Sequence, residues 1–167
     1  YAVDPNGGDF PDMTSAGQAL TERGIESNVR FEVATGSYTD TVVVGPINFA
    51  CEANDQSIVE FVSATENAAD VTVSSTQNGG GATFTLNGEV NLLLRHLTID
   101  ADGTTPIALL TDAAADALTL DSVNVRGSLE NNGRVILESP LSIGGDLSNF
   151  GSFEHNGLPI TLDGDQP

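Results

Sequence analysis

The chain alternates short apolar stretches with polar turn residues along nearly its whole length after Gly24. Within each stretch the apolar residues occupy every second position, which is the period of a β-strand with one buried face. Gly, Asn, Asp and Pro separate the stretches, as expected for turns between strands. We therefore predict short strands at residues 29–33, 38–44, 58–62, 71–74, 83–86, 92–94, 97–99, 118–120, 123–125, 135–137, 141–143 and 160–162.

An apolar-x-apolar pattern recurs in the second half of the chain at steps of 26, 18 and 19 residues, beginning at Leu97, Val123, Leu141 and Ile160. Longer segments superpose as well: residues 92–99 match 118–125, and residues 128–133 match 146–151. Asn-Gly turns also occur, so turn composition alone leaves a β-sandwich open. Repeats of about twenty residues indicate a solenoid, in which each unit buries its apolar face against its neighbours.

The predicted fold is therefore all-β: a single-stranded, right-handed parallel β-helix with roughly six or seven coils, each adding about 4.8 Å along the axis. One segment has helical character. Residues 14–23 follow Pro11-Asp12 and end at Gly24, but Gly17 and two threonines make this a weak independent helix. We expect it to be held by packing, as a cap on the first coil. Residues 1–8 form an N-terminal arm, and residues 9–167 form one β-helix domain.

The start of the chain resembles that of pectate-lyase-like right-handed β-helices. The resemblance rests on Gly8-Asp9-Phe10-Pro11 before a short helix and on Gly36-Ser37-Tyr38, which is similar to the G-x-Y turn that begins the second coil in that family. From Ser128 onward the chain is similar to repeats of large secreted bacterial surface proteins. The resemblance covers most of residues 8–164. It implies the fold and an extracellular setting, and only weakly an activity on acidic polysaccharides.

Composition narrows the possible partners. The chain has 24 acidic residues, five arginines and no lysine, for a formal charge of −19. Such a charge repels phosphates, so we expect no nucleic-acid partner, and no apolar run is long enough for membrane insertion. The single cysteine, Cys51, lies in an apolar stretch, which favours a buried thiol. The chain starts at Tyr1 without a leader, which is typical of a mature secreted protein or of a trimmed chain.

Charged residues on the 92–126 segment are the candidates for a carbohydrate site: Arg95, His96, Asp121 and Arg126. On the 26-residue repeat, however, Arg95 falls beside Asp121, and Asp100 falls beside Arg126. Opposite charges on adjacent strands form lateral pairs that support the register. No second carboxylate joins either pair at the spacing that acid–base hydrolysis needs, so we predict no catalytic residue and favour a non-enzymatic protein.

Asp100-Ala101-Asp102-Gly103 is the best candidate for a metal site. Two carboxylates, Asp100 and Asp102, lie two residues apart beside a glycine turn, which suits the oxygen ligands that Ca²⁺ prefers. The segment lacks the distal glutamate of a full calcium loop, and an ordinary solvated turn is the alternative.

The two ends of a solenoid expose strand edges that can pair with another chain. We expect the arm, through Tyr1, Ala2 and Val3, to add to a neighbour's last coil around Leu158, Ile160 and Leu162. Identical subunits joined head to tail in this way form a filament. The predicted function is thus a structural subunit of a secreted, extracellular or cell-surface assembly, a homo-oligomer or polymer. One alternative is a disordered arm and a last coil exposed by truncation; another is a carbohydrate-binding or polysaccharide-degrading β-helix.

Overall fold

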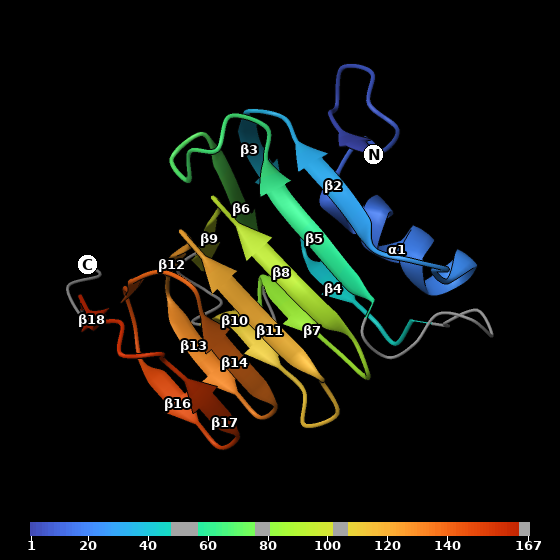
Figure 1. Cartoon of the computed structure of the whole chain (residues 1–167). Helices are drawn as coiled ribbons and strands as arrows, with labels where there is room; N and C mark the ends of the chain where they lie inside the picture. The colour runs from blue at the N-terminus through green and yellow to red at the C-terminus, as the bar shows by residue number, and fades with distance from the viewer. Residues whose placement is uncertain (48–56, 76–80, 102–106, 164–167) are drawn as a thin grey trace.

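The computed structural model describes residues 1–47, 57–75, 81–101 and 107–163. Its strands stack into three parallel sheets around one core (Figure 1). In spatial order, the seven-stranded sheet contains β1 (Ala2–Val3), β2 (Val29–Val33), β5 (Ile58–Ser63), β8 (Asn91–Arg95), β11 (Ala117–Asp121), β14 (Arg134–Leu137) and β17 (Ser152–Glu154). The six-stranded sheet contains β3 (Gly36–Thr39), β6 (Val71–Ser75), β9 (Thr98–Ala101), β12 (Asn124–Arg126), β15 (Leu141–Ile143) and β18 (Ile160–Leu162). The five-stranded sheet contains β4 (Val42–Val44), β7 (Phe84–Leu86), β10 (Ile107–Thr111), β13 (Ser128–Asn131) and β16 (Leu147–Asn149).

The chain visits the seven-, six- and five-stranded sheets in turn and then returns to the first, one strand further along. This connectivity confirms the predicted all-β parallel β-helix with an N-terminal helix. The described residues form five coils of three strands and a sixth with two, at the lower end of the predicted six or seven. The number is low because the first coils are long: successive coils advance by 30, 33, 26, 17 and 18 residues, as the aligned positions Val29, Val59, Leu92, Leu118, Val135 and Phe153 show.

The interior consists of files of aliphatic side chains that stack from coil to coil. One file on the six-stranded sheet begins at Tyr38 and continues through Val73, Ile99, Val125 and Ile143, all of them buried. On β6, β8 and β14, for example, buried positions alternate with more exposed ones, so the period of two in the sequence becomes an inner face and an outer face. Burying each such aliphatic side chain contributes about 1.5–3 kcal/mol before the cost in conformational entropy.

The repeats read from the sequence match the strand register. Leu92 pairs with Leu118 and Arg95 with Asp121, as the superposition of residues 92–99 on 118–125 predicts. The second superposition is confirmed by the pairing of Leu129 with Leu147. Because a shift of one residue would turn every inward side chain outward, these matches fix the faces of the strands.

Helix α1 (Met13–Arg23) packs on the edge of the five-stranded sheet at β4, in agreement with the predicted cap. It begins one residue earlier than predicted, after Asp12, whose carboxylate accepts the Ser15 N–H at 2.7 Å. Gly17 is essential to the close packing, because a Cβ there would lie 2.7 Å from the Val43 carbonyl oxygen. The glycine that lowers the intrinsic helix propensity is thus the residue that allows the close contact with β4.

One detail of the predicted start differs. Gly36-Ser37-Tyr38 does not form a turn that opens the second coil; it belongs to β3, the second strand of the first coil. The Tyr38 hydroxyl donates to the Ala34 carbonyl at 2.8 Å, and burial together with the charges of Asp4 and Asp40 raises the pKa of this phenol. The tyrosine therefore fastens the bend between β2 and β3 rather than beginning a new coil.

A short polar ladder runs through the core at the end of the five-stranded sheet. Thr111, Asn131 and Asn149 occupy equivalent positions on β10, β13 and β16. The Thr111 hydroxyl donates to Asn131 Oδ1 at 2.6 Å, and Asn131 Nδ2 donates to Asn149 Oδ1 at 2.7 Å. Asn131 is fully buried and Asn149 is exposed, so the ladder begins inside the molecule and ends at its C-terminal surface.

Candidate functional surfaces

The N-terminal arm is docked on its own chain. Ala2 and Val3 form β1, which pairs in parallel with Glu32 and Val33 of β2. The Tyr1 carbonyl accepts the Glu32 N–H at 2.8 Å, and Val3 has no exposed surface. This differs from the expectation of a free arm: Tyr1, Ala2 and Val3 lie on the edge of their own first coil. Their contact with a second subunit stays a prediction.

Beyond β1 the sheet narrows to a single residue. Phe10 forms an isolated parallel bridge with Val3; its N–H donates to the Ala2 carbonyl at 3.1 Å, and its carbonyl accepts the Asp4 N–H at 2.9 Å. Successive layers of this edge are therefore five residues, two residues and one residue wide. A tapering edge leaves few unpaired backbone groups for another strand to join.

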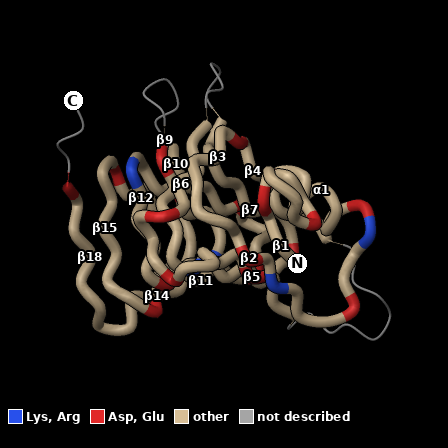
Figure 2. Tube along the Cα trace, turned by 90° about the horizontal axis from the view of Figure 1, so that it is seen from above, with Lys and Arg blue, Asp and Glu red and all other residues tan. Residues whose placement is uncertain are grey.

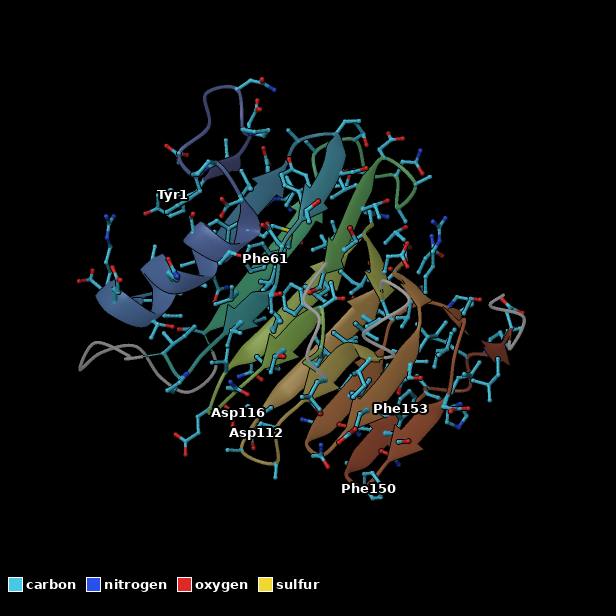
Figure 3. The ribbon with its side chains drawn as sticks, turned by 180° about the vertical axis from the view of Figure 1, so that it is seen from behind. Tyr1, Phe61, Asp112, Asp116, Phe150 and Phe153 are labelled. Atoms are coloured by element: carbon cyan, nitrogen blue, oxygen red, sulfur yellow. The ribbon has the colours of Figure 1, made fainter. Side chains whose placement is uncertain are left out.

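Aromatic rings form a column at the same end of the molecule. Phe31 stacks on Phe61 with ring centroids 4.7 Å apart, and Tyr1 stacks on Phe31 at 5.7 Å. Phe10 meets both Tyr1 and Phe31 edge to face. In Figure 3, Tyr1 lies at the end of the solenoid beside α1, and Phe61 lies inside it. Such pairs add to the stabilisation that burial alone provides.

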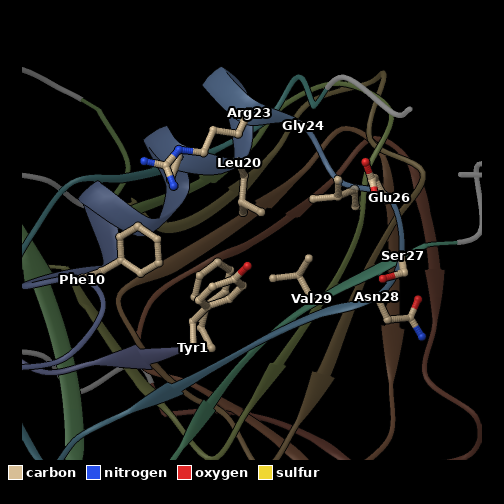
Figure 4. Close-up of a pocket in the computed structure, with 12 residues that line it drawn as sticks. Tyr1, Phe10, Leu20, Arg23, Gly24, Glu26, Ser27, Asn28 and Val29 are labelled. Carbon is tan, nitrogen blue, oxygen red and sulfur yellow. The ribbon is translucent and has the colours of Figure 1, made fainter. Parts of the chain in front are cut away.

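A hollow of about 380 Å³ opens between this aromatic column and the C-terminal end of α1 (Figure 4). Tyr1, Phe10 and Phe31 form its aromatic side, and Leu20 and Ile25 supply aliphatic surface. Tyr1 is 68% exposed although its ring covers Phe31. The hollow is therefore an accessible cavity at the N-terminal end, with an aromatic and aliphatic wall and polar groups such as Arg23, Glu26 and Asn28 around it.

The opposite end of the solenoid is uncovered in the described part of the chain. Strands β16, β17 and β18 are the last members of their sheets, and no other described segment pairs with their outer edges. Of the predicted contact residues there, Leu158 and Ile160 are partly buried against the core, and Leu162 is 56% exposed. The turn between β16 and β17 exposes Phe150 by 76%, and Phe150 lies at the end remote from Tyr1 in Figure 3.

Arg95 is the centre of a charge cluster on the outer face of the seven-stranded sheet. Its guanidinium contacts Asp121 at 2.8 Å, as the repeat predicts, but also Glu60 at 3.1 Å and Glu138 at 3.5 Å. Burial alone would lower the pKa of Arg95; the hydrogen bond to Asp121 and the charges of the three carboxylates raise it. Glu60 and Glu138 thus join the predicted pair, and one arginine links residues from four coils.

The remaining carbohydrate-site candidates are not all brought together. His96 is adjacent to Arg95 at the end of β8, has a φ of 54°, and donates its backbone N–H to the Asp121 carbonyl at 3.0 Å. Arg126 lies on the six-stranded sheet and faces Asp100 at 3.9 Å. Both predicted lateral pairs therefore exist, but on two different sheets. Acidic groups outnumber basic ones along the trace (Figure 2), and Arg95 is already surrounded by carboxylates.

A shallow depression of about 310 Å³ lies beside this cluster on the same outer face. Its lining combines aliphatic side chains with a few polar ones: Ile58, Leu93, Ile136, Asn91, Thr119, Arg134 and Glu138. None of these lining residues is aromatic, so this depression offers no ring on which a sugar could stack.

Only one of the two predicted calcium ligands lies in the described part of the chain. Asp100 lies at 3.9 Å from Arg126, and Asp102 lies outside the described residues, as does Cys51. Within the described ranges, no group of three His, Cys, Asp or Glu side chains is placed to hold a metal ion. Calcium binding by Asp100 and Asp102 stays a prediction.

The fold defines the class of this protein as a parallel β-helix domain. No protein-family model, no curated protein and no solved structure matches the chain. Among the described residues, no helix combines the length and apolar character that crossing a membrane requires. The geometry of the surfaces is therefore the basis for any functional proposal.

Two features of these surfaces were missed by the sequence analysis. Glu60 and Glu138 approach Arg95 from coils whose lengths differ from the 26-residue repeat, so no fixed spacing connected them. Phe150 was aligned with Asn132 within the second superposition, and this replacement of a polar turn residue by an aromatic one was an available signal for a contact surface.

Proposed function

We propose that this chain is a structural subunit of an extracellular or cell-surface assembly that contacts its neighbours through the C-terminal coil. The observation that carries the proposal is the contrast in edge protection. Strands β16, β17 and β18 end the three sheets without a covering segment in the described residues, and Phe150 and Leu162 are exposed there. Exposed strand edges and large exposed apolar groups favour association with another chain.

The outer surface also suits a structural role. Arg30, Arg95 and Arg134 each contact a carboxylate on a neighbouring strand, which supports the stacking of coils. An arginine surrounded by carboxylates in this way is poorly placed to bind an acidic substrate, because its charge is already compensated. The extracellular setting is part of the proposal and rests on the resemblance of the sequence to secreted bacterial β-helix proteins.

Sedimentation velocity of the whole chain over a wide range of concentrations tests this function. We expect the sedimentation coefficient to rise with concentration, and negative-stain images to show elongated particles several subunits long. Monomers alone at the highest concentration would refute it. Because the charge of −19 opposes association, the same series in 0.5 M salt should show assembly at lower protein concentration.

A second candidate, carbohydrate binding, is favoured by the depression beside Arg95 on the outer face of the seven-stranded sheet. Asn91, Thr119 and Arg134 provide hydrogen-bonding groups there. Calorimetric titration with acidic and neutral polysaccharides, with and without Ca²⁺, tests both this binding and the predicted role of Asp100 and Asp102. Heat on adding Ca²⁺ alone would support the metal site, and heat only on adding a polysaccharide would support the sugar site.

A further inference from the structure

We infer that copies of this chain associate end to end, with Phe150 of one copy inserted into the aromatic hollow at the N-terminal end of the next. The inference rests on the proposed assembly function and names its partner and contact. It starts from two features at opposite ends of the solenoid: an exposed phenylalanine and a hollow of about 380 Å³ with an aromatic wall.

The two features lie at the same corner of the coil. Phe150 is in the turn that leads from β16 of the five-stranded sheet to β17 of the seven-stranded sheet. At the other end, α1 packs on β4 of the five-stranded sheet, and residues 24–28 lead from it to β2 of the seven-stranded sheet. Residues 24–28 also line the hollow. A second copy that continues the solenoid axis would therefore bring the hollow over Phe150.

The Phe150 turn is held in one conformation. The Asn131 carbonyl accepts the N–H groups of Phe150 at 2.8 Å and of Gly151 at 3.1 Å. Gly151 lies so close to the preceding coil that a Cβ there would be 1.9 Å from the Gly133 carbonyl oxygen. An exposed aromatic side chain on a fixed turn loses little conformational freedom when it binds, and this favours association.

The hollow suits an aromatic side chain. Its wall contains Tyr1, Phe10 and Phe31, whose rings already meet in stacked and edge-to-face arrangements. A further ring would extend the column and cover Tyr1, which is 68% exposed. Aromatic anchors in preformed apolar pockets contribute a large share of binding energy at protein interfaces.

Charges near the two ends are compatible with this contact. Arg23 lines the hollow and forms no ion pair with another described residue, whereas the other four arginines do. Residues 139–163 contain three carboxylates, at Asp146, Glu154 and Asp163, and no lysine or arginine. Glu26 also lines the hollow, so its rim is close to neutral in a strongly acidic chain. The incoming acidic coil would therefore meet Arg23, an arginine that forms no ion pair with another described residue.

The contact differs from strand addition. Because β1, Phe10 and α1 already cover the first coil, an incoming copy rests on this cap instead of pairing with β2 or β4. The association is heterologous, since the surface that receives Phe150 differs from the surface that presents it. Because each copy continues the solenoid axis of the one before, the contacts do not close into a ring, and open chains of subunits result.

The first test replaces Phe150 in the whole chain. Phe150→Ser should leave the circular dichroism spectrum and melting temperature of the monomer unchanged, because the side chain is exposed. It should raise the concentration at which half of the protein is assembled by roughly 10- to 100-fold, the equivalent of burying one phenylalanine. Ile58→Ser, at a 40% exposed site on the outer face, is the matched control and should assemble like the wild type.

The second test places a photo-reactive phenylalanine analogue at position 150. Illumination of the assembled protein should give cross-links between subunits to Tyr1, Phe10, Leu20 or Ile25, identified by mass spectrometry. The same analogue at position 58 should give none to these residues. Normal assembly of Phe150→Ser, or cross-links from position 150 to another surface, would overturn this contact while the assembly function stands. A wild-type protein that stays monomeric would refute the contact and the function together.

Discussion

The two ends of this solenoid differ in how the edges of their terminal strands are covered. At the N-terminal end, β1 and Phe10 taper the seven-stranded sheet, and α1 covers the five-stranded one at β4. At the C-terminal end, the last strand of each sheet is partly exposed, and no described segment lies over it. The first end buries phenylalanines, whereas the second exposes Phe150. Among the described residues, the solenoid is thus covered at its N-terminal end, by segments that add no full coil.

The coils also differ between the two ends: they are longer toward the N-terminus. The first three advance by 30, 33 and 26 residues and the last two by 17 and 18, as the positions aligned with Val29 show. Long coils leave room for loops and for aromatic layers in the core, and short coils have little more than three strands and their turns. The N-terminal half therefore contains more of the irregular structure, and the C-terminal half is the more regular repeat.

The largest expected difference in stability is between truncating a phenylalanine at the N-terminal end and truncating one at the C-terminal end. Phe31→Ala removes a 1% exposed ring from the centre of the aromatic column and should lower the free energy of unfolding by about 3–5 kcal/mol. Phe150→Ala should change it by no more than about 0.5 kcal/mol in dilute, monomeric protein. Urea unfolding followed by circular dichroism measures both. Equal losses would contradict the view that only the N-terminal end is closed.

A smaller effect should separate the two ends of the polar ladder. Asn131→Leu removes the acceptor of the buried Thr111 hydroxyl, at a cost of about 1–3 kcal/mol. Asn149→Leu removes one hydrogen bond at an exposed position and should cost about 0.5–1.5 kcal/mol. The same urea experiment applies. A greater loss at Asn149 would mean that the C-terminal edge is more ordered than its exposure indicates.

Much of this fold follows from the sequence because a β-helix repeats one local rule. Alternation at Leu97-Thr98-Ile99 and its equivalents gave the strands, and the 26-residue superposition gave the pairing of Arg95 with Asp121. The docking of Val3 on Val33 was not predictable in this way, because a two-residue strand has no period. The contact between Glu60 and Arg95 was not predictable either, because it depends on the length of a coil that no other coil shares. Periodicity thus predicts the stack, and non-repeating segments decide how its ends are closed.

The helix that caps the first coil should depend on its first hydrogen bond. Asp12→Ala removes the acceptor of the Ser15 N–H and should cost about 1 kcal/mol, seen as a lower melting temperature. Asp12→Asn keeps an acceptor oxygen and serves as the control, with a melting temperature close to that of the wild type. If Asp12→Ala melted like the control, α1 would owe its stability to packing on β4 alone.

The smallest expected effect is a difference in how the contributions of the two ends to stability depend on pH. Asp40 accepts the Met13 N–H at 3.1 Å beneath α1, and burial, followed by the charge of Asp12, raises its pKa above the ordinary value. In the last coil, the hydrogen bond from Arg134 lowers the pKa of Glu154. A raised carboxyl pKa means that the folded chain holds its proton longer than the unfolded chain does, so this contribution weakens as pH rises through the folded pKa. A lowered pKa has the opposite consequence: the stabilisation is present at neutral pH and is lost as pH falls.

Asp40→Asn and Glu154→Gln therefore form a pair with opposite pH signatures. Relative to each variant, the wild type should become less stable as pH rises through the raised pKa of Asp40, and less stable as pH falls through the lowered pKa of Glu154. The difference in urea midpoint between wild type and variant, measured from pH 3 to pH 7, isolates each group from the other carboxylates. Glu154 is solvent-exposed, so its difference should be the smaller and should shrink further in high salt. Differences of the same sign at both sites would show that the pKa values of Asp40 and Glu154 are not shifted in opposite directions.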